Sequence, residues 1–242
     1  METSYPEPGE RGGSICSWAY LGHIGYVEAW DLQRSLAMAR AGGKIGDVLL
    51  LLEHPPTYTL GRRSKESDLL LSRKELEAQG AMVMDIDRGG EITFHGPGQL
   101  VGYAIIDLRS WGSPLKYVRA LEAVLVDTLD VFSIRASRIE GLTGVWAKGA
   151  KVGAIGVRVS RGVTTHGFAL NVTTDLSWFQ NVVPCGIRDR NVSSMEQLGA
   201  LAIPLKEVAQ VVAQRFGNEL GFTMKEVASG EAVAVGTPAL SA

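Results

Sequence analysis

The segment Asp47–His54, with the sequence DVLLLLEH, constrains the fold more than any other part of the chain. Its apolar residues are consecutive rather than alternating, and the run has the length of a strand. This pattern indicates a strand that is buried on both faces. Pro55 and Pro56 follow directly and end the strand. The chain is therefore expected to build a sheet around this segment.

Helix and strand signals surround this run and predict a mixed fold. Helical spacing, capping residues and terminal glycines predict four helices, at Tyr26–Ala41, from Ser72 to near Gly80, at Ser113–Phe132 and from Pro204 to Gly221. Short β-rich stretches predict strands at Ile15–Leu21, Thr57–Gly61 and Ala81–Asp87, and two or three more within Val145–Val172.

These signals place the chain in the α+β class. We predict a single domain with a mixed, largely antiparallel sheet and flanking helices packed on one side of it. The domain is expected to span residues 14–227. Residues 1–13 and 228–242 are small, glycine-punctuated segments that we predict to be flexible tails.

Composition and charge narrow the class of function. A net charge of −2 gives no electrostatic reason to expect nucleic acid or an anionic membrane as partner. We find neither a secretory signal nor an apolar run long enough to span a membrane. The two cysteines, Cys16 and Cys185, lie far apart and form no C-x-x-C pair. We expect a cytoplasmic enzyme or binding protein without a metal site.

Three glycine-rich segments carry more polar chemistry than a core strand requires. They are RGGEITFHGPGQLVGY at Arg88–Tyr103, GAKVGAIGVRV at Gly149–Val159 and THGFALNV at Thr165–Val172. Glycine weakens a strand unless something approaches its backbone closely. A bound ligand is one explanation for the first segment, and a bulged hairpin is the other. The alternative for Lys151 in the second segment is a lysine at a strand end with its ammonium in water.

Cys185, within NVVPCGIRD, is the candidate nucleophile. A free cysteine is often an inert buried side chain, and an unaided thiol with a pKa of about 8.5 is little ionised at pH 7. Reactivity would require an activating group. The residues alone leave five candidates open: His54, His95, His166, Lys148 and Lys151.

Taken together and in order, these motifs resemble those of the lipoyl(octanoyl) transferase family. RGGEITFHGPGQLVGY, KVGAIGVRVSRGVTTHGFALNV and VPCGI carry the resemblance, EHPPTYTLG fits as well, and the similarity runs from about Ile15 to Phe222. The resemblance implies the α+β catalytic fold of the biotin and lipoate protein ligases. It also implies transfer of octanoyl from octanoyl-acyl carrier protein to one lysine of an apo lipoyl domain, in 2-oxoacid dehydrogenase E2 subunits or the glycine cleavage H protein.

The resemblance also assigns roles to individual residues. Cys185 corresponds to the acyl-enzyme cysteine, and Lys151 to the lysine that lowers its pKa. The implied contacts with the acyl substrate are Arg88, Gly89, Gly90, Glu91, Ile92, Thr93, Phe94 and His95, then Ala154, Ile155 and Gly156, and finally Gly167, Phe168 and Ala169. No cofactor or metal is implied, because the acyl group arrives as an activated thioester.

Two further expectations concern the shape and charge of the site. Gly153, Gly156 and Gly167 are expected to leave a slot for an eight-carbon chain, with Phe168 and Ile155 as its walls. A basic mouth that docks acidic partner proteins could be formed by Arg62, Arg63, Lys65, Arg158 and Arg161.

Three other functions compete with this interpretation. An ATP-dependent lipoate or biotin ligase would share the fold but would need nucleotide and Mg²⁺, and it would not need the cysteine. A non-catalytic module could bind lipoyl domains or carrier protein with Cys185 buried. In a Cys–His hydrolase, His95 rather than Lys151 would activate the thiol.

Overall fold

An eight-stranded mixed sheet forms the centre of the molecule. The computed structural model describes residues 13–182, 191–200 and 203–236. The strand order is β11-β1-β2-β6-β10-β9-β8-β7. β1 pairs in parallel with both β2 and β11, and the remaining neighbours pair antiparallel. The strands are β1 (Ser14–His23), β2 (Asp47–Glu53), β6 (Gln99–Ile105), β7 (Ser137–Ile139), β8 (Leu142–Ala147), β9 (Ala150–Ser160), β10 (Val163–Asn171) and β11 (Phe222–Glu226). The predicted mixed, largely antiparallel sheet is confirmed.

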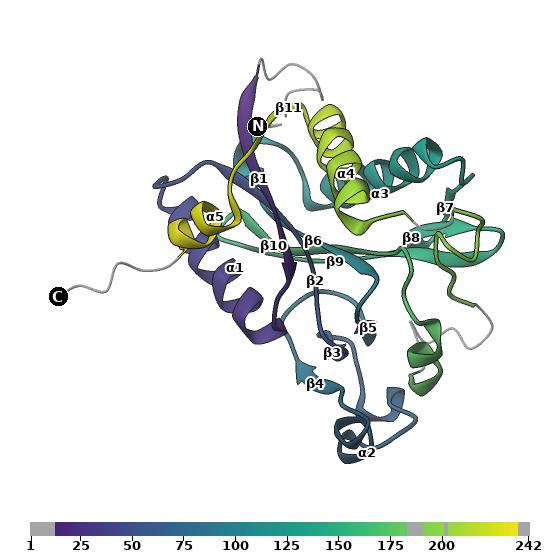
Figure 1. Cartoon of the computed structure of the whole chain (residues 1–242). Helices are drawn as coiled ribbons and strands as arrows, with labels where there is room; N and C mark the ends of the chain where they lie inside the picture. Colours follow the sequence, from purple (N-terminus) through teal and green to yellow (C-terminus); the bar gives the residue numbers. More distant parts are fainter. Residues whose placement is uncertain (1–12, 183–190, 201–202, 237–242) are drawn as a thin grey trace.

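A second, three-stranded sheet lies at one end of the large one (Figure 1). β3 (Thr57–Leu60) is its central strand, between β4 (Met82–Asp85), which is parallel to it, and β5 (Thr93–His95), which is antiparallel. β5 and β6 therefore belong to different sheets and do not pair as a hairpin. The connection between them, His95–Gln99, links the two sheets.

Helices cover both faces of the large sheet, which corrects the prediction that they pack on one side. α3 (Pro114–Val131) and α4 (Leu205–Leu220) lie together on one face, and α1 (Tyr26–Ala41) and α5 (Ser229–Gly236) lie on the other (Figure 1). The reason lies in β2. Its alternate side chains enter different cores, with Leu49 and Leu51 facing α4 and Leu50 and Leu52 facing α1. A strand that is apolar on both faces needs a helical layer on each.

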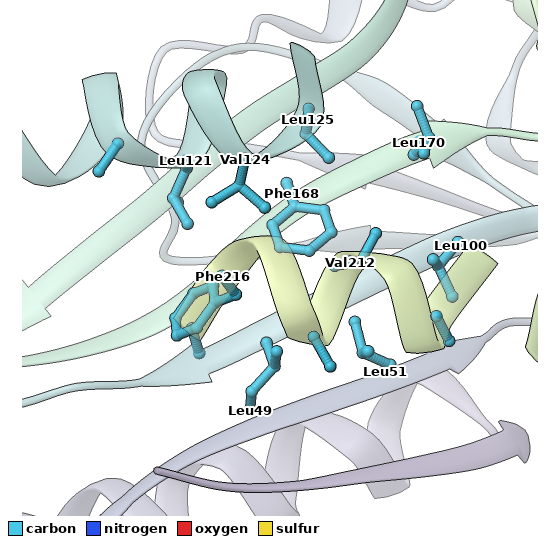
Figure 2. Close-up of a cluster of buried hydrophobic side chains, with 14 of the residues drawn as sticks. Leu49, Leu51, Leu100, Leu121, Val124, Leu125, Phe168, Leu170, Val212 and Phe216 are labelled. Atoms are coloured by element: carbon cyan, nitrogen blue, oxygen red, sulfur yellow. The ribbon is translucent and has the colours of Figure 1, made fainter. Parts of the chain in front are cut away.

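The core beneath α3 and α4 is the larger apolar cluster (Figure 2). Leu121, Val124 and Leu125 of α3 pack with Val212 and Phe216 of α4 against the sheet. All five side chains are fully buried, so this layer fixes the position of the strands from which the cavity described below is built.

The predicted helix boundaries follow from capping chemistry. Ser72 accepts a hydrogen bond from the Glu75 N–H, and the Glu75 carboxylate accepts one from the Ser72 N–H, which begins α2 (Arg73–Ala78). Ser113 caps α3 by accepting a hydrogen bond from the Lys116 N–H, with Pro114 in the first turn. Gly221 ends α4 in the left-handed conformation. Three short 3₁₀ segments complete the described elements: η1 (Glu66–Asp68), η2 (Leu108–Ser110) and η3 (Leu176–Asn181).

The C-terminal part of the chain differs from the predicted tail. Residues Ser229–Gly236 form α5, and Ala232 is buried in the cluster under α1. Residues 1–12 and 237–242, also predicted as tails, lie outside the described residues. Among the helices that the structure describes, none combines the length and the apolar character needed to cross a bilayer.

Candidate active site

A cavity of about 380 Å³ is lined by strands of the large sheet and by the segment that connects β4 to β5. Residues from α1, β5, β6, β8, β9 and β10 contribute to its wall. It gathers Lys151 and most of the substrate-contact residues predicted from the sequence, namely Arg88, Gly90, Glu91, Ile92, Thr93, His95, Ala154, Ile155, Gly156, Gly167, Phe168 and Ala169. Three chain segments that are remote in sequence thus meet at one cavity.

Strand register gives the cavity an apolar floor. Ala169 pairs with Val101 on one side and Ala154 on the other, so these three residues lie in one row across β6, β10 and β9. Residues paired across neighbouring strands project from the same face of a sheet. Small side chains along this row leave a shallow apolar surface that an alkyl chain could occupy.

Ile155 and Phe168 do not wall this floor with their side chains, contrary to the expectation. They pair with each other across β9 and β10, one position away from the floor row, so their side chains point to the opposite face. The ring of Phe168 lies in the core of α3 and α4 (Figure 2), and Ile155 packs against the same cluster. A Cβ at Gly102 would overlap that ring, which explains the glycine opposite Phe168.

The space beside the glycines that were expected to form a slot is instead occupied by other atoms of the protein. A Cβ at Gly153 would meet Leu125 Cδ1 at 2.9 Å, and one at Gly156 would meet Arg88 Cδ at 3.0 Å. At Gly167 it would overlap the Gly102 carbonyl oxygen. A glycine at each of these positions allows close packing within the fold.

The segment after β4 is hydrogen-bonded to β9 through its backbone and to β3 through the Arg88 side chain. The Gly89 N–H donates to the Val157 carbonyl at 3.0 Å, and the Arg88 guanidinium donates to the backbone and hydroxyl oxygens of Thr59 at 2.8 and 2.9 Å. Arg88 thereby joins β3 to the cavity wall. Gly89 and Phe94 are the two predicted contact residues that do not line the cavity, and Phe94 is buried in a separate cluster, stacked on Trp178.

A bulge in β9 turns Lys151 toward the cavity. Val145 of β8 pairs with Gly153 of β9, but the next residue of β8, Trp146, pairs with Lys151. Val152 therefore lies between two paired positions as one extra residue in β9. Val152 and Val145 both lie in the core with α3. The extra residue reverses the alternation, and Lys151 therefore faces the cavity beside Trp146. The ammonium nitrogen Nζ lies 4.8 Å from the centroid of the Trp146 ring.

Gly144 and Glu122 determine the position of the strand that the Lys151 side chain crosses. A Cβ at Gly144 would meet the Gly153 carbonyl oxygen at 2.7 Å and Lys151 Cε at 3.3 Å, so the lysine stem crosses the space above this glycine. The Gly144 N–H donates to Glu122 Oε1 at 3.0 Å, and Glu122 is fully buried and ion-paired to Arg119 at 2.6 Å. α3 thus fixes the strand on which the Lys151 side chain rests.

The predicted nucleophile, Cys185, lies outside the described residues, as do all residues from 183 to 190. The residues that follow this segment are hydrogen-bonded to the backbone of Lys151. The Lys151 N–H donates to the Asn191 carbonyl at 2.9 Å, and the Ser193 N–H donates to the Lys151 carbonyl at 2.9 Å. Asn191 and Val192 also line the cavity.

His95 belongs to a buried hydrogen-bonded network. Its Nδ1 lies 2.8 Å from Gln99 Oε1. Gln99 Nε2 donates to the Phe94 carbonyl at 3.1 Å and to Asn171 Oδ1 at 2.9 Å, and Asn171 Nδ2 donates to the Ser193 carbonyl at 3.0 Å. Burial lowers the pKa of His95 well below its ordinary value, with nearby His54 and Arg88 acting in the same direction. His95 is therefore neutral at pH 7.

The other proposed activating groups have structural partners or lie elsewhere. His54 Nδ1 is 2.8 Å from the Ile24 carbonyl and Nε2 is 2.7 Å from the Tyr103 hydroxyl, while burial lowers the pKa of His54 to about 4. His166 Nε2 lies 2.9 Å from Asp87 Oδ1, and burial lowers the pKa of this histidine. Lys148 is exposed in the turn between β8 and β9.

Several cavity residues were not singled out from the sequence. Tyr26, Tyr103, Trp146 and Asn171 line the cavity with the predicted set. Asn171 could have been suspected, because it is an amide at the end of an apolar strand. The aromatic residues carry no local signal that separates them from core residues. Of the predicted basic mouth, Arg63 lines the cavity, whereas Arg158 is 3.3 Å from Asp87 in an ion pair.

Solved structures of low sequence similarity share this architecture. A bi-partite lipoate protein ligase from Thermoplasma acidophilum matches with a TM-score of 0.67 at 16% sequence identity, covering 92% of this chain and 90% of that one. Biotin protein ligase from Aquifex aeolicus, solved with biotin and ATP, matches with a TM-score of 0.54 at 16% identity, covering 85% of this chain and 70% of that one. The fold is that of the catalytic domains of lipoate and biotin protein ligases, as predicted.

Sequence comparison identifies the family within this fold. The model of the lipoyl protein ligase A/B catalytic domain matches residues 25–217. The octanoyltransferase of Chloroflexus aggregans is 52% identical over 194 residues, which cover 78% of this chain and 88% of that protein. The chain belongs to the octanoyltransferase family. The family and the enzyme class, an acyltransferase, are confirmed.

Proposed function

We propose that this acyltransferase moves octanoyl from acyl carrier protein to a lysine of an apo lipoyl domain, through a thioester on Cys185. The observation that carries the proposal is the position of Lys151. Its side chain faces the cavity, and its backbone is hydrogen-bonded to the residues that follow the Cys185 segment. The catalytic domain proposed from the sequence, residues 14–227, contains every residue that lines this cavity.

Electrostatic attraction between an ammonium and a thiolate is the reason for pairing Lys151 with Cys185. An ammonium about 4 Å from a thiolate, at an effective dielectric near 20, favours the ionised sulfur by up to roughly 4 kcal/mol. That corresponds to about three pKa units before desolvation is subtracted. A cysteine next to such a group is a nucleophile at pH 7 without a histidine base. The neutral state of His54 and His95 is consistent with this assignment.

Two half-reactions follow. The Cys185 thiolate attacks the donor thioester, the carbon–sulfur bond to the carrier breaks, and the carrier thiolate leaves with a proton from Lys151. The neutral amine of the acceptor lysine then attacks the acyl-enzyme, the amide carbon–nitrogen bond forms as the carbon–sulfur bond to Cys185 breaks, and the amine proton passes through Lys151 to the Cys185 sulfur. The first step exchanges one thioester for another, and the second is downhill.

The alanine row suits the acyl chain. Ala154 and Ala169 with Val101 provide an apolar surface beside Lys151 on the same face of the sheet. Each methylene that leaves water contributes about 0.8 kcal/mol before the costs of association. We propose that this surface binds octanoate and that the acceptors are the lipoyl domains of 2-oxoacid dehydrogenase E2 subunits and the glycine cleavage H protein.

Intact-mass spectrometry tests the proposal. Mixed with octanoyl carrier protein, the wild-type chain should gain one octanoyl group, located on Cys185 by peptide mapping. Cys185→Ser should gain no thioester, and Lys151→Ala should lose at least 100-fold in the rate of labelling at pH 7. Near-normal labelling of Lys151→Ala together with loss in His95→Ala would instead support the Cys–His alternative.

Two controls separate the remaining alternatives. Octanoate, ATP and Mg²⁺ should not replace octanoyl carrier protein as donor, and modification of the apo domain under those conditions would support a ligase. An unlabelled wild-type protein that still binds the apo domain would support the binding module.

A further inference from the structure

The orientation of the Gln99 amide fixes the protonation of His95. The Phe94 carbonyl oxygen can only accept a hydrogen bond, so the group 3.1 Å from it must be the Gln99 NH₂. The amide oxygen then faces His95 Nδ1, which must carry the proton of the neutral ring. Nε2 is left as a hydrogen-bond acceptor. No described residue is its partner.

This acceptor lies at the same end of the sheet as Lys151. Gln99 pairs with Asn171 across β6 and β10, and Leu170 next to it pairs with Gly153 of β9. Two strand spacings, about 10 Å, therefore separate Gln99 from the start of β9. Asn171 Nδ2 donates to the Ser193 carbonyl, and the Ser193 N–H donates to the Lys151 carbonyl. Hydrogen bonds therefore link the His95 ring through Gln99, Asn171 and Ser193 to the backbone of Lys151.

The hydrogen-bonded network of His95, Gln99 and Asn171 is buried. Gln99 is 2% exposed, Asn171 5% and His95 6%. The Tyr26 ring stacks on His95 at 5.8 Å, and the His54 ring meets its edge at 5.9 Å. Satisfied polar networks in a low-dielectric interior hold their members in one arrangement. The imidazole is therefore presented to the cavity in one tautomer and one orientation.

We propose that His95 Nε2 accepts a hydrogen bond from the amine of the acceptor lysine during the second half-reaction, and that Gln99 and Asn171 are positioning residues that hold it in the Nδ1–H tautomer. The bond orients the nitrogen lone pair toward the acyl carbonyl. The carbon–nitrogen bond forms and the carbon–sulfur bond breaks. His95 does not keep the proton, which passes to the sulfur. This inference rests on the proposed acyl-enzyme function.

A matched pair of substitutions separates the two ring nitrogens. His95→Asn keeps an amide near the position of Nδ1, so it can still donate to Gln99 but offers nothing at the position of Nε2. His95→Gln places its amide near the position of Nε2. Gln99→Met removes the group that selects the tautomer and keeps a similar volume.

Each half-reaction is measured by itself at pH 7. Because His95 and Gln99 both line the cavity, the rate of Cys185 acylation by octanoyl carrier protein should also fall in the variants, but by a smaller factor than the transfer step. Transfer from the preformed acyl-enzyme to an apo lipoyl domain should fall at least ten-fold in His95→Asn and Gln99→Met, with partial recovery in His95→Gln. Hydroxylamine needs no such orientation, so its cleavage of the acyl-enzyme should remain unchanged.

Nitrogen-15 NMR of the histidine rings gives a readout that loss of stability would not produce. Wild-type His95 should show the Nδ1–H tautomer alone, and Gln99→Met should show a mixture. An Nε2–H tautomer in wild type, or an equal loss of both half-reactions in His95→Asn, would overturn the inference. Failure of the wild-type protein to form any acyl-enzyme would refute the proposed function instead.

Discussion

At the scale of single residues, the site contains buried histidines that are neutral at pH 7. His54 is fully buried, with Nδ1 bonded to the Ile24 carbonyl, an obligate acceptor, and Nε2 bonded to the Tyr103 hydroxyl. Each ring nitrogen of neutral His54 therefore has a hydrogen-bond partner. Burial lowers the pKa of His54 to about 4, and the pKa values of His95 and His166 are lowered as well.

This burial makes stability depend on pH. Below pH 6.5 the unfolded chain takes up a proton at His54, whereas the folded protein does so only near pH 4, so the free energy of unfolding falls as the solution becomes more acidic. Between pH 7 and pH 5, His54 alone should account for a loss of about 2 kcal/mol. Urea unfolding at both pH values measures it.

His54→Gln should be less stable than wild type at pH 7 but should show a shallower decline with pH. An unchanged slope in His54→Gln would mean that His54 titrates alike in the folded and unfolded chain.

At the scale of elements, one α-helix and one bulge determine where Lys151 points. The extra residue Val152 turns the lysine from the α3 face to the cavity face, and Glu122 of α3 holds the N–H of Gly144 beneath it. A buried carboxylate that serves both Gly144 and Arg119 is difficult to replace, since each partner would lose a charged acceptor.

We therefore expect Glu122→Gln to cost about 1–3 kcal/mol of folding free energy, measured by urea unfolding. The new NH₂ group would face the Arg119 guanidinium, donor against donor, while the bond to Gly144 could persist. Glu77→Gln on the exposed side of α2 is the matched control and should change stability by less than about 0.5 kcal/mol. A Glu122→Gln protein as stable as this control would contradict the assigned role.

The elements were predictable where the signal is local. Ser72 with Glu75, Ser113 with Pro114, and Gly221 each mark a helix end through contacts within a few residues, and the structure contains them. The second helical layer and the bulge were not predictable. DVLLLLEH indicates burial on both faces but not what covers them, and the position of Val152 depends on pairing with β8.

At the scale of the whole molecule, the cavity is the product of topology. The segments Arg88–His95, Lys151–Gly156 and Gly167–Ala169 meet because β9 and β10 are neighbours in the large sheet and Gly89 hydrogen-bonds to Val157 of β9. Sequence patterns flagged each segment as unusual, but only the family resemblance ordered them into one site. It could not show that the glycines serve internal packing or that Phe168 belongs to the opposite core.

The central claim is that the Lys151 ammonium keeps the Cys185 sulfur ionised, and the pKa of that thiol tests it most directly. The rate of alkylation by iodoacetamide is measured from pH 4 to pH 10 in a Cys16→Ala background. Cys16 is buried, and burial raises its pKa, so this change removes a thiol with no assigned chemistry. We predict a midpoint well below 8.5 for Cys185 with Lys151 present, and a return to about 8.5 in Lys151→Ala. The same midpoint in both proteins would contradict the account.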